Sequence, residues 1–398
     1  MNPDLALLHP YPFEKLADLK AGVVPPPELA HIALSIGEPK HTPPSFVLDA
    51  LVNELPRLSN YPATRGIPEL REAIASWLQQ RFKLAPSSIS PEHQVLPVNG
   101  TREALFAFAQ ASIDRSKDPV VMMNNPFYQI YEGAALLAGA QAVYLNCEKE
   151  NGYLPDLRLV PDDTWARTQL LYLCTPNNPC GSTFKQAQFN EIFALSEKFN
   201  FIIASDECYS EIYPDEANPP LGLLQAAQAY GLADFSRCIV FHSLSKRSNL
   251  PGLRSGFVAG DSHIIGDFLK YRTYHGCAMS VPNQLASIAA WNDESHVHSN
   301  RDAYREKFAT VSTILAPHLD FDSPEAAFYL WPRTPISDTE FARRLYAHSN
   351  VTVLPGSFLG RDSNGTNPGS NHVRMALVAS IDECRMAAER IAHFVQTL

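Results

Sequence analysis

Short apolar runs alternate with amphipathic stretches between residues 94 and 274. The runs have the length and β-branched content of buried strands, and turns separate them from stretches whose apolar residues recur at helical spacing. Strands that alternate with helices in this way form a mostly parallel sheet with helices on both faces. Ligands of such sheets bind beyond the carboxyl ends of the strands. We therefore expect the chemistry of this chain in the turns that follow its strands.

This pattern predicts an α/β fold whose large domain holds a mostly parallel, seven-stranded sheet sandwiched by helices. The predicted strands are Gln94–Val98, Val120–Met123, Ala142–Leu145, Leu170–Cys174, Phe201–Ser205, Ile239–Phe241 and Gly256–Ala259, and the predicted helices between them span 101–113, 129–138, 185–199 and 261–274. After residue 280 the pattern changes to that of a smaller α+β region, with predicted strands at Ala327–Trp331, Val351–Leu354 and His372–Ala376.

The domain organisation that we expect has three segments. Residues 1–45 are a proline-rich N-terminal arm that joins the small domain, 46–285 are the large domain, and 286–398 are the small C-terminal domain. A chain of 398 residues is long enough for one large and one small domain.

Net charge and cysteine usage limit the kinds of partner and the cellular compartment that we expect for this chain. The net charge of −10 argues against a nucleic-acid surface, and no apolar run is long enough for a membrane span. The seven cysteines are scattered and lie mostly in apolar runs, which is typical of reduced thiols. The N-terminus lacks the basic and apolar regions of a signal peptide. We expect a cytoplasmic protein with no nucleic-acid or membrane partner.

Lys246 lies in a polar turn between two predicted strands. An ammonium group beside Arg247 and Arg254 and partly shielded from water is disfavoured, so its pKa should fall. The resulting amine can form a Schiff base with an aldehyde. Ser243, Ser245 and Arg254 suit a phosphate. An aldehyde that also carries a phosphate is pyridoxal 5'-phosphate, although a solvated surface lysine is the alternative.

Two further turns carry groups that such a cofactor could use. Gly100-Thr101-Arg102 opens a predicted helix, where backbone N–H groups and a hydroxyl can hold a phosphate. Asp206 ends a buried strand, and a protonated pyridine nitrogen would be a suitable partner for its carboxylate. Tyr209 could reach the phenolic oxygen of the ring. Taken alone, ordinary helix caps explain both turns.

Three more groups follow or lie in strands. An asparagine amide of the turn-rich segment 174–181 could donate to the same phenolic oxygen, with a plain loop as the alternative. Tyr128 could stack on a flat ring, with a core position as the alternative. Arg374 is a charge in an otherwise apolar strand and could clamp a carboxylate with two hydrogen bonds. A structural salt bridge is the alternative for Arg374.

These strings, in this order, resemble the fold-type-I pyridoxal-phosphate enzymes, specifically the class I and II aminotransferases. The resemblance runs from Ser35-Ile-Gly-Glu-Pro39 to Arg374. It implies three catalytic residues: Lys246 forms the Schiff base and moves the proton, Asp206 pairs with the pyridinium, and Tyr209 binds the phenolic oxygen.

The resemblance also implies the remaining binding roles. Those for the phosphate are Gly100, Thr101, Arg102, Ser243, Ser245 and Arg254. Asn178 would bind the phenolic oxygen, Tyr128 would stack on the ring, and Gly37 and Arg374, with Asn178, would hold the substrate. Tyr61 would reach the phosphate of the neighbouring subunit, which requires a homodimer with shared active sites. No metal is implied. The chain departs from the family at Cys180, where threonine is frequent, but that side chain has no assigned role.

Within the family, three strings are most similar to the bacterial N-succinyldiaminopimelate aminotransferases of lysine biosynthesis: Asn99–Phe106, Asn125–Gly133 and Ser245–Gly256. This implies amino transfer between glutamate/2-oxoglutarate and N-succinyl-2-amino-6-oxopimelate. The second carboxylate of the substrate then needs another cation, and the sequence leaves four candidates open: Arg65, Arg247, Arg272 and Arg361.

Other functions remain as alternatives. An aspartate-type or other aminotransferase, or a pyridoxal-phosphate β-lyase, would use the same cofactor residues. A cofactor-binding regulator would need a basic DNA-binding domain, and there is no room for one ahead of residue 30. A nicotinamide dehydrogenase or a Ser-His-Asp hydrolase would need a Gly-x-Gly-x-x-Gly or a Gly-x-Ser-x-Gly turn, which the chain lacks. The close pair His296 and His298 lies at a charged helix start, where a solvated face is expected rather than a metal site.

Overall fold

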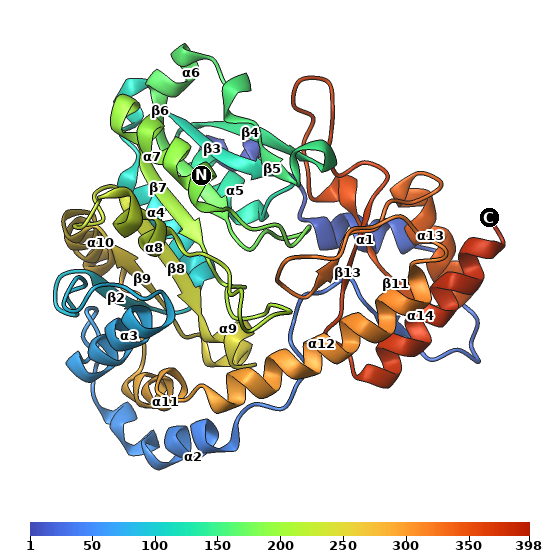
Figure 1. Cartoon of the computed structure of the whole chain (residues 1–398), viewed down its shortest axis with the longest axis horizontal. Helices are drawn as coiled ribbons and strands as arrows, with labels where there is room; N and C mark the ends of the chain where they lie inside the picture. The colour runs from blue at the N-terminus through green and yellow to red at the C-terminus, as the bar shows by residue number, and fades with distance from the viewer.

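The computed structural model describes residues 1–398, and its largest element is an eight-stranded sheet (Figure 1). In spatial order the strands are β2 (Val95–Val98), β9 (Gly256–Gly260), β8 (Cys238–Ser243), β7 (Ile202–Asp206), β6 (Thr168–Cys174), β3 (Val120–Asn125), β4 (Gln141–Glu148) and β5 (Leu154–Pro155). Strands β8, β7, β6, β3 and β4 pair in parallel, whereas β9 runs antiparallel to β8 and β2. The predicted mostly parallel α/β sheet is confirmed.

The eighth strand, β5, is an addition to the seven that the sequence predicts. It pairs antiparallel with Cys147–Glu148 at the end of β4. A strand of two residues is too short to leave an alternation of apolar and polar residues, so the sequence carries no signal for it.

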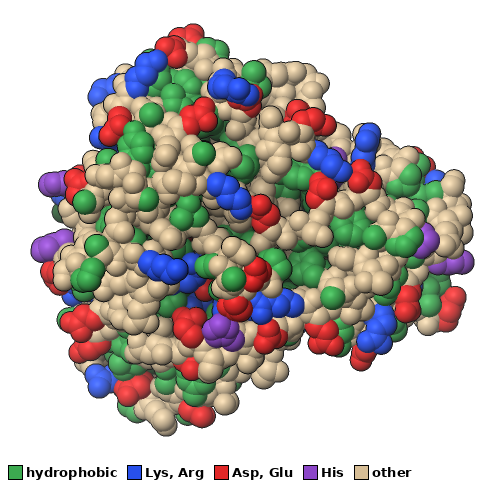
Figure 2. Space-filling view, viewed as in Figure 1, with side chains coloured by type: hydrophobic (Ala, Val, Ile, Leu, Met, Phe, Trp, Pro, Cys, Tyr) green, Lys and Arg blue, Asp and Glu red, His purple; other side chains and the backbone are tan.

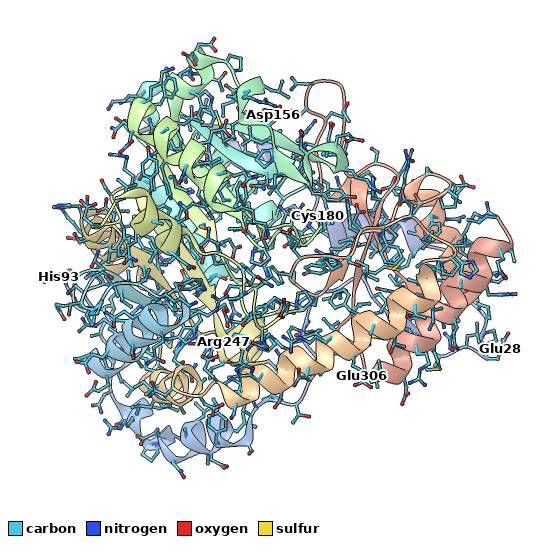
Figure 3. All side chains as sticks on the ribbon, viewed as in Figure 1. Glu28, His93, Asp156, Cys180, Arg247 and Glu306 are labelled. Atoms are coloured by element: carbon cyan, nitrogen blue, oxygen red, sulfur yellow. The ribbon has the colours of Figure 1, made fainter.

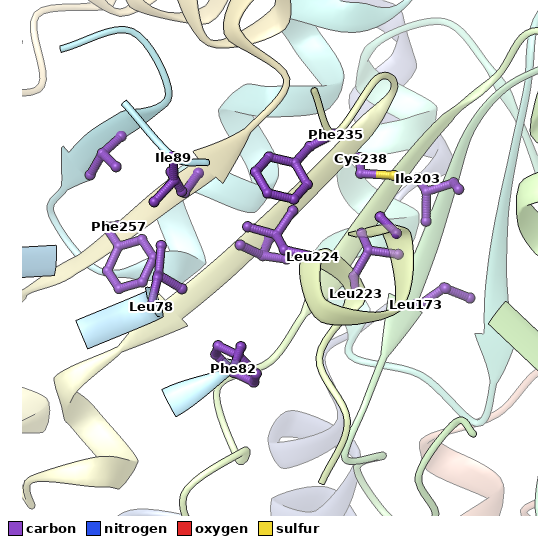
Figure 4. Close-up of a cluster of buried hydrophobic side chains, with 14 of the residues drawn as sticks. Leu78, Phe82, Ile89, Leu173, Ile203, Leu223, Leu224, Phe235, Cys238 and Phe257 are labelled. Carbon is purple, nitrogen blue, oxygen red and sulfur yellow. The ribbon is translucent and has the colours of Figure 1, made fainter. Parts of the chain in front are cut away.

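Helices cover both faces of the sheet because successive strand residues point to opposite sides. Ile239 and Phe241 of β8 pack into one cluster and Val240 into the other. The first cluster lies under α4 (Thr101–Ser112), α5 (Gln129–Leu137) and α10 (Ser262–His275). The second lies under α3 (Pro68–Arg81), α7 (Gln186–Phe199), α8 (Leu223–Tyr230) and α11 (Val281–Trp291). Helix α8 is not among the helices predicted from the sequence. Figure 4 shows its residue Leu224 in the second cluster, to which Leu78 and Phe257 also belong.

A small lobe lies beside the large sheet. Its elements are β1 (Ile32–Ala33), α12 (Ser295–Leu315), β10 (Tyr329–Leu330), α13 (Asp338–Ser349), β11 (Val351–Thr352), β12 (Leu354–Pro355), β13 (Val373–Ala376) and α14 (Ile381–Gln396). Strands β10, β13 and β12 form one antiparallel sheet, and β1 pairs in parallel with β11. The strand predicted at Val351–Leu354 is therefore two strands in two sheets, and the long helix α12 leads from one lobe to the other (Figure 1).

The N-terminal arm joins the two lobes. Helix α1 (Pro12–Lys20) contacts α13 and β12, and Ile32 and Leu34 lie in the core of the small lobe. Helix α2 (Ser45–Asn53) packs on α11 instead. The domain boundaries at 45 and 285 stay a prediction.

Acidic and basic side chains are interspersed over the face drawn in Figure 2, without a patch of one sign. None of the helices combines the length and the hydropathy that crossing a bilayer would require. All seven cysteines are free thiols.

Candidate active site

A cavity of about 640 Å³ opens at the carboxyl ends of β6, β7 and β8, where the N-terminal arm and the small lobe close over the sheet. Among its lining residues are Gly37, Thr101, Arg102, Tyr128, Asn178, Asp206, Tyr209, Ser243, Ser245, Lys246, Arg254 and Arg374. The structure thus brings together every predicted site residue except Gly100 and Tyr61. Of these two, Gly100 lies directly under the guanidinium of Arg254.

Lys246 faces this cavity from α9 (Leu244–Arg247), a helical turn that follows β8. Its Nζ donates a hydrogen bond of 2.5 Å to the carbonyl of Gly37 and lies 5.4 Å from the ring centroid of Phe328. Burial, aided by the charge of Arg374, lowers the pKa of Lys246 to about 8. A substantial neutral fraction near pH 8 makes the amine a nucleophile and a base.

Asp206 is the last residue of β7 and is almost fully buried. Its Oδ2 accepts a hydrogen bond of 2.6 Å from the hydroxyl of Tyr131, and its Oδ1 accepts one of 3.2 Å from the backbone N–H of Cys208. Burial raises the pKa of this carboxyl, and the two donors oppose that rise. No cationic side chain forms an ion pair with Asp206, so the carboxylate can accept a cationic partner from the cavity.

One end of the cavity is a polar cup where α4 begins. Gly100 has a φ of +83°, and a Cβ on it would collide with the guanidinium of Arg254. That guanidinium donates to the backbone carbonyls of Pro251 (2.8 Å) and Asn99 (3.4 Å) and has no acidic partner. A free guanidinium over a helix N-terminus is an anion-binding arrangement.

Two serines line the other side of the cup. The Ser243 hydroxyl accepts from the backbone N–H of Ser245, and the two hydroxyls are 2.9 Å apart. Thr101 at the start of α4 has its hydroxyl 3.1 Å from the Cys208 sulfur. These short hydroxyl groups can donate to a phosphate without moving their backbone.

Arg374 comes from β13 and is buried without a carboxylate. Its guanidinium donates to Oδ1 of Asn178 (2.9 Å) and to the carbonyl of Ser35 (2.7 Å), and it lies over the ring of Tyr329 at 4.6 Å. Gly37 is packed against the phenol of Tyr329 so closely that it has no room for a side chain. These contacts fix the orientation of Arg374 and leave its charge for an anion in the cavity.

Tyr209 and Tyr128 are the predicted aromatic partners of a ring. The Tyr209 hydroxyl is 2.9 Å from that of Tyr329, and Tyr128 stands at the N-terminus of α5, edge-on to Tyr131. Burial raises the pKa of both phenols, so both remain neutral hydrogen-bonding groups.

Sequence reasoning missed several residues of the cavity, of which Tyr131, Tyr329, Tyr11 and Glu38 are the most prominent. The one available signal is for Tyr131, which follows Tyr128 by three residues and therefore shares its helix face. Tyr329 and Tyr11 come from distant segments, and nothing local marks them.

Tyr61 does not line this cavity. It is fully exposed two residues after the 3-10 helix η2 (Leu55–Ser59), and exposed apolar side chains precede it along α2 and η2. These are Phe46, Leu48, Val52, Leu55 and Leu58. The role predicted for Tyr61, in a neighbouring subunit, stays a prediction.

None of the four arginines proposed for a second substrate carboxylate lines the cavity. Each already pairs with an acid: Arg65 with Glu92, Arg247 with Glu294, Arg272 with Glu103, and Arg361 with Glu132. Figure 3 labels Arg247, the last residue of α9, near the start of α12, and its guanidinium also donates to the carbonyl of Ala290 in α11. The only arginines in the cavity are Arg102, Arg254 and Arg374.

Two clusters outside the cavity contain possible metal ligands. Glu103, His275 and Cys277 lie within 4.8 Å of one another, but the oxygens of Glu103 already accept from Arg272 and from the backbone of Asn99. His296 and His298 have separate acidic partners, Asp293 and Glu216.

Cys180, the departure from the family pattern, is buried beside Trp331 and Leu354. Its sulfur donates to Oδ1 of Asn177. The side chain therefore has a packing role in the turn that carries Asn178.

Residues 30–391 match the family described as aminotransferase class I and II. Among curated relatives, the LL-diaminopimelate aminotransferase of Nitratidesulfovibrio vulgaris (strain DP4) is 31% identical over 394 residues, which cover 98% of this chain and 97% of the relative. That of Aquifex aeolicus (strain VF5) is 30% identical over 97% of both chains.

Two solved structures are similar over nearly their whole length. An aminotransferase from Neisseria meningitidis Z2491 has a TM-score of 0.95 and 48% identity, with 99% of each chain covered. The aminotransferase AspB from Helicobacter pylori 26695 has a TM-score of 0.90 and 34% identity, covering 98% of this chain and all of the other.

Proposed function

This chain belongs to the class I and II aminotransferase family, and from that premise we propose that it moves an amino group between glutamate/2-oxoglutarate and N-succinyl-2-amino-6-oxopimelate, with pyridoxal phosphate as cofactor. The observation that carries the proposal is one cavity in which an amine of lowered pKa and a buried carboxylate lie among three arginines without acidic partners.

The residues present fit pyridoxal phosphate. Arg254, the N-terminus of α4 and the two serine hydroxyls would hold the phosphate, and Asp206 would hold the ring nitrogen. Tyr128 would stack on the ring. The Oδ1 of Asn178 accepts a hydrogen bond from Arg374, so the Nδ2 of Asn178 is left to donate to the phenolic oxygen.

Bound pyridoxal phosphate supplies an electron sink for the α-carbon of an amino acid. The chain itself supplies the positioning and the proton transfer. Arg374 would bind the substrate α-carboxylate with two parallel hydrogen bonds, which holds the α-carbon facing Lys246. The neutral Nζ of Lys246 would then take the proton from the α-carbon and, as the ammonium, would give it up on the cofactor side of the linkage.

The second carboxylate of both substrates needs a cation, and Arg102 is the group that we propose. It has no hydrogen-bond acceptor and no ion pair among the side chains of this chain, and its guanidinium lies 5.7 Å from the ring centroid of Tyr11. Its positive charge also acts on the phenol of Tyr128. In this proposal the backbone N–H of Arg102 serves the phosphate at the start of α4, while its guanidinium binds the distal carboxylate.

The charges of the cavity favour the N-succinyl substrate over free LL-diaminopimelate, on which the curated relatives act according to their names. Free diaminopimelate carries an ammonium group beside its distal carboxylate, and that ammonium would need an acid, but no carboxylate of this chain pairs with Arg102. The acids of the cavity are Asp206, which accepts from Tyr131, and Glu38, which adjoins Gly37 on the Lys246 side. The N-succinyl substrate lacks this ammonium charge and adds a carboxylate, so its distal end presents only anions to the free guanidinium of Arg102.

The test is a panel of half-reactions, followed by loss of the cofactor's absorption band, with N-succinyl-LL-diaminopimelate, LL-diaminopimelate, glutamate, aspartate and alanine. We expect N-succinyl-LL-diaminopimelate and glutamate to react fastest. In Arg102→Met the reaction with these two should slow by about tenfold or more, since a hydrogen bond to a charged group is lost, while alanine should be little affected.

Lys15→Met is the matched control for Arg102→Met. Lys15 is a cation that follows the lining residues Pro12 and Phe13 along α1 but does not itself line the cavity; it lies over the ring of Phe358. A preference for LL-diaminopimelate over its N-succinyl form would contradict the substrate assignment. Loss of selectivity in the Lys15 variant instead of the Arg102 variant would contradict the role of Arg102.

A homodimer is part of the proposal. The exposed apolar side chains of α2 and η2 lie next to Tyr61 and form a surface that a second copy could cover, bringing Tyr61 to its cavity. Sedimentation should then give twice the 44.1 kDa mass of the chain, and a monomer at assay concentration would contradict it. We also propose a cytoplasmic location, which the free state of all cysteines supports.

A further inference from the structure

Tyr131 has a buried hydroxyl whose only acceptor is the carboxylate of Asp206, at 2.6 Å. We propose that Tyr131 is a positioning residue, which keeps Asp206 ionised and aims its free lone pairs at the cofactor nitrogen. The inference rests on the proposed cofactor and adds a residue to which neither the sequence pattern nor the family resemblance assigned a role.

The position of Tyr131 is fixed by packing. Its ring stacks on that of Tyr172 with centroids 4.8 Å apart and planes at 13°, and it meets Tyr128 edge-on at 5.8 Å. A phenol held on two sides cannot swing away from Asp206 without opening the cluster between α5 and the sheet. The hydrogen bond is therefore built into the fold.

Each carboxylate oxygen of Asp206 accepts a hydrogen bond. Oδ2 accepts from Tyr131 and Oδ1 from the backbone of Cys208, so each oxygen keeps a lone pair for another donor. The other titratable groups that act on this carboxylate or feel its charge are Tyr128, Tyr172, Tyr329, Cys174, Cys208, His242 and Lys246. Among these side chains, Tyr131 donates to the carboxylate through a hydroxyl, and the thiol of Cys208 also hydrogen-bonds to it.

A donor matters here because Asp206 is buried, and burial favours the protonated acid. A protonated Asp206 would lose its attraction for a pyridinium. The Tyr131 hydroxyl stabilises the anion, and it occupies one side of Oδ2 so that the remaining lone pairs point elsewhere.

The experiment compares Tyr131→Phe with Tyr172→Phe. Tyr172 is the stacking partner of Tyr131, equally buried, and its hydroxyl donates over the same 2.6 Å, but to the backbone carbonyl of Leu105. Each change deletes one oxygen atom from the same stack. Thermal unfolding of both variants controls for stability.

Two quantities are measured: the dissociation constant of pyridoxal phosphate from the cofactor-free chain, and the pH midpoint of the bound cofactor's absorption change. Tyr131→Phe should bind the cofactor about tenfold more weakly, because a hydrogen bond to a charge is lost. Its midpoint should move to higher pH, since a less protonated ring nitrogen withdraws fewer electrons from the linkage to Lys246. Tyr172→Phe should leave both values as in the native chain.

Asp206→Asn tests whether Tyr131 acts through the charge of Asp206. In that background, Tyr131→Phe should change cofactor affinity much less than in the native chain. Native-like values in Tyr131→Phe, or equal shifts in Tyr172→Phe, overturn the inference while the proposed function stands. A native chain that takes up no pyridoxal phosphate overturns both.

Discussion

Lys246→Ala is expected to slow amino transfer by about 10⁴-fold, because the variant loses both the nucleophile and the proton-transfer group in one step. Lys246 is the only lysine that lines the cavity, so no other amine of the chain can replace it. The variant should still bind pyridoxal phosphate through Arg254 and Asp206, but the absorption band of the covalent linkage should be missing. Absorption spectra and single-turnover kinetics measure both effects.

The lowered pKa of Lys246 adds a pH dependence to this prediction. Below pH 8 the Nζ carries a proton and cannot attack an aldehyde, and above it the amine is neutral. The rate at which the cofactor-free native chain captures pyridoxal phosphate should therefore rise with pH through a midpoint near 8. A midpoint near the ordinary value for lysine would mean that the amine is exposed to water.

Lys246→Arg is the control for loss of charge, because it keeps a cation but not a nucleophile. It should be as inactive as Lys246→Ala and equally without the covalent absorption band. A Lys246→Ala chain that keeps the native colour and turns over at more than a small fraction of the native rate would show that the reacting amine lies elsewhere.

Arg374→Lys is expected to lower kcat/KM by about 100-fold for the amino donor and for the oxo acceptor alike. Both substrates have an α-carboxylate, and a lysine cannot make two parallel hydrogen bonds while it also contacts Asn178 and the carbonyl of Ser35. Most of the loss should be in KM. Steady-state kinetics on both substrates measure it.

The matched control is Arg301→Lys. Arg301 is as buried as Arg374 but binds Glu216 and Glu211, away from the cavity. It should affect thermal stability and leave KM unchanged. If Arg374→Lys impaired only one of the two substrates, the guanidinium would not be the shared carboxylate site.

Much of the fold was predictable because its signals are local. Residues 239–241 alternate between the two faces of the sheet, and the turn after them contains Lys246; both facts are contained in one short string. Gly100 before α4 and Asp206 at the end of β7 also lie in the same short string as the strand that precedes each of them. Strand β5 and helix α8 were missed, since β5 is two residues long and α8 spans only eight residues, about two turns.

The cation for the distal substrate carboxylate could not be chosen from local sequence patterns. Arg65, Arg247, Arg272 and Arg361 are as plausible in the sequence as Arg102, and only the folded chain reveals that the first four already have acidic partners. Their partners are between 27 and 229 residues away along the chain. No local pattern in a single sequence predicts such ion pairs.

The sequence by itself determined the order of strands, turns and helices, and with them which amine, carboxylate and glycine stand at the ends of strands. Only the tertiary structure decided which cations remain free and that Tyr131 donates to Asp206. The physical reason is that strand ends follow from the repeat of apolar residues along the chain, whereas the ionisation of a side chain depends on which groups from distant segments lie within a few ångströms of it.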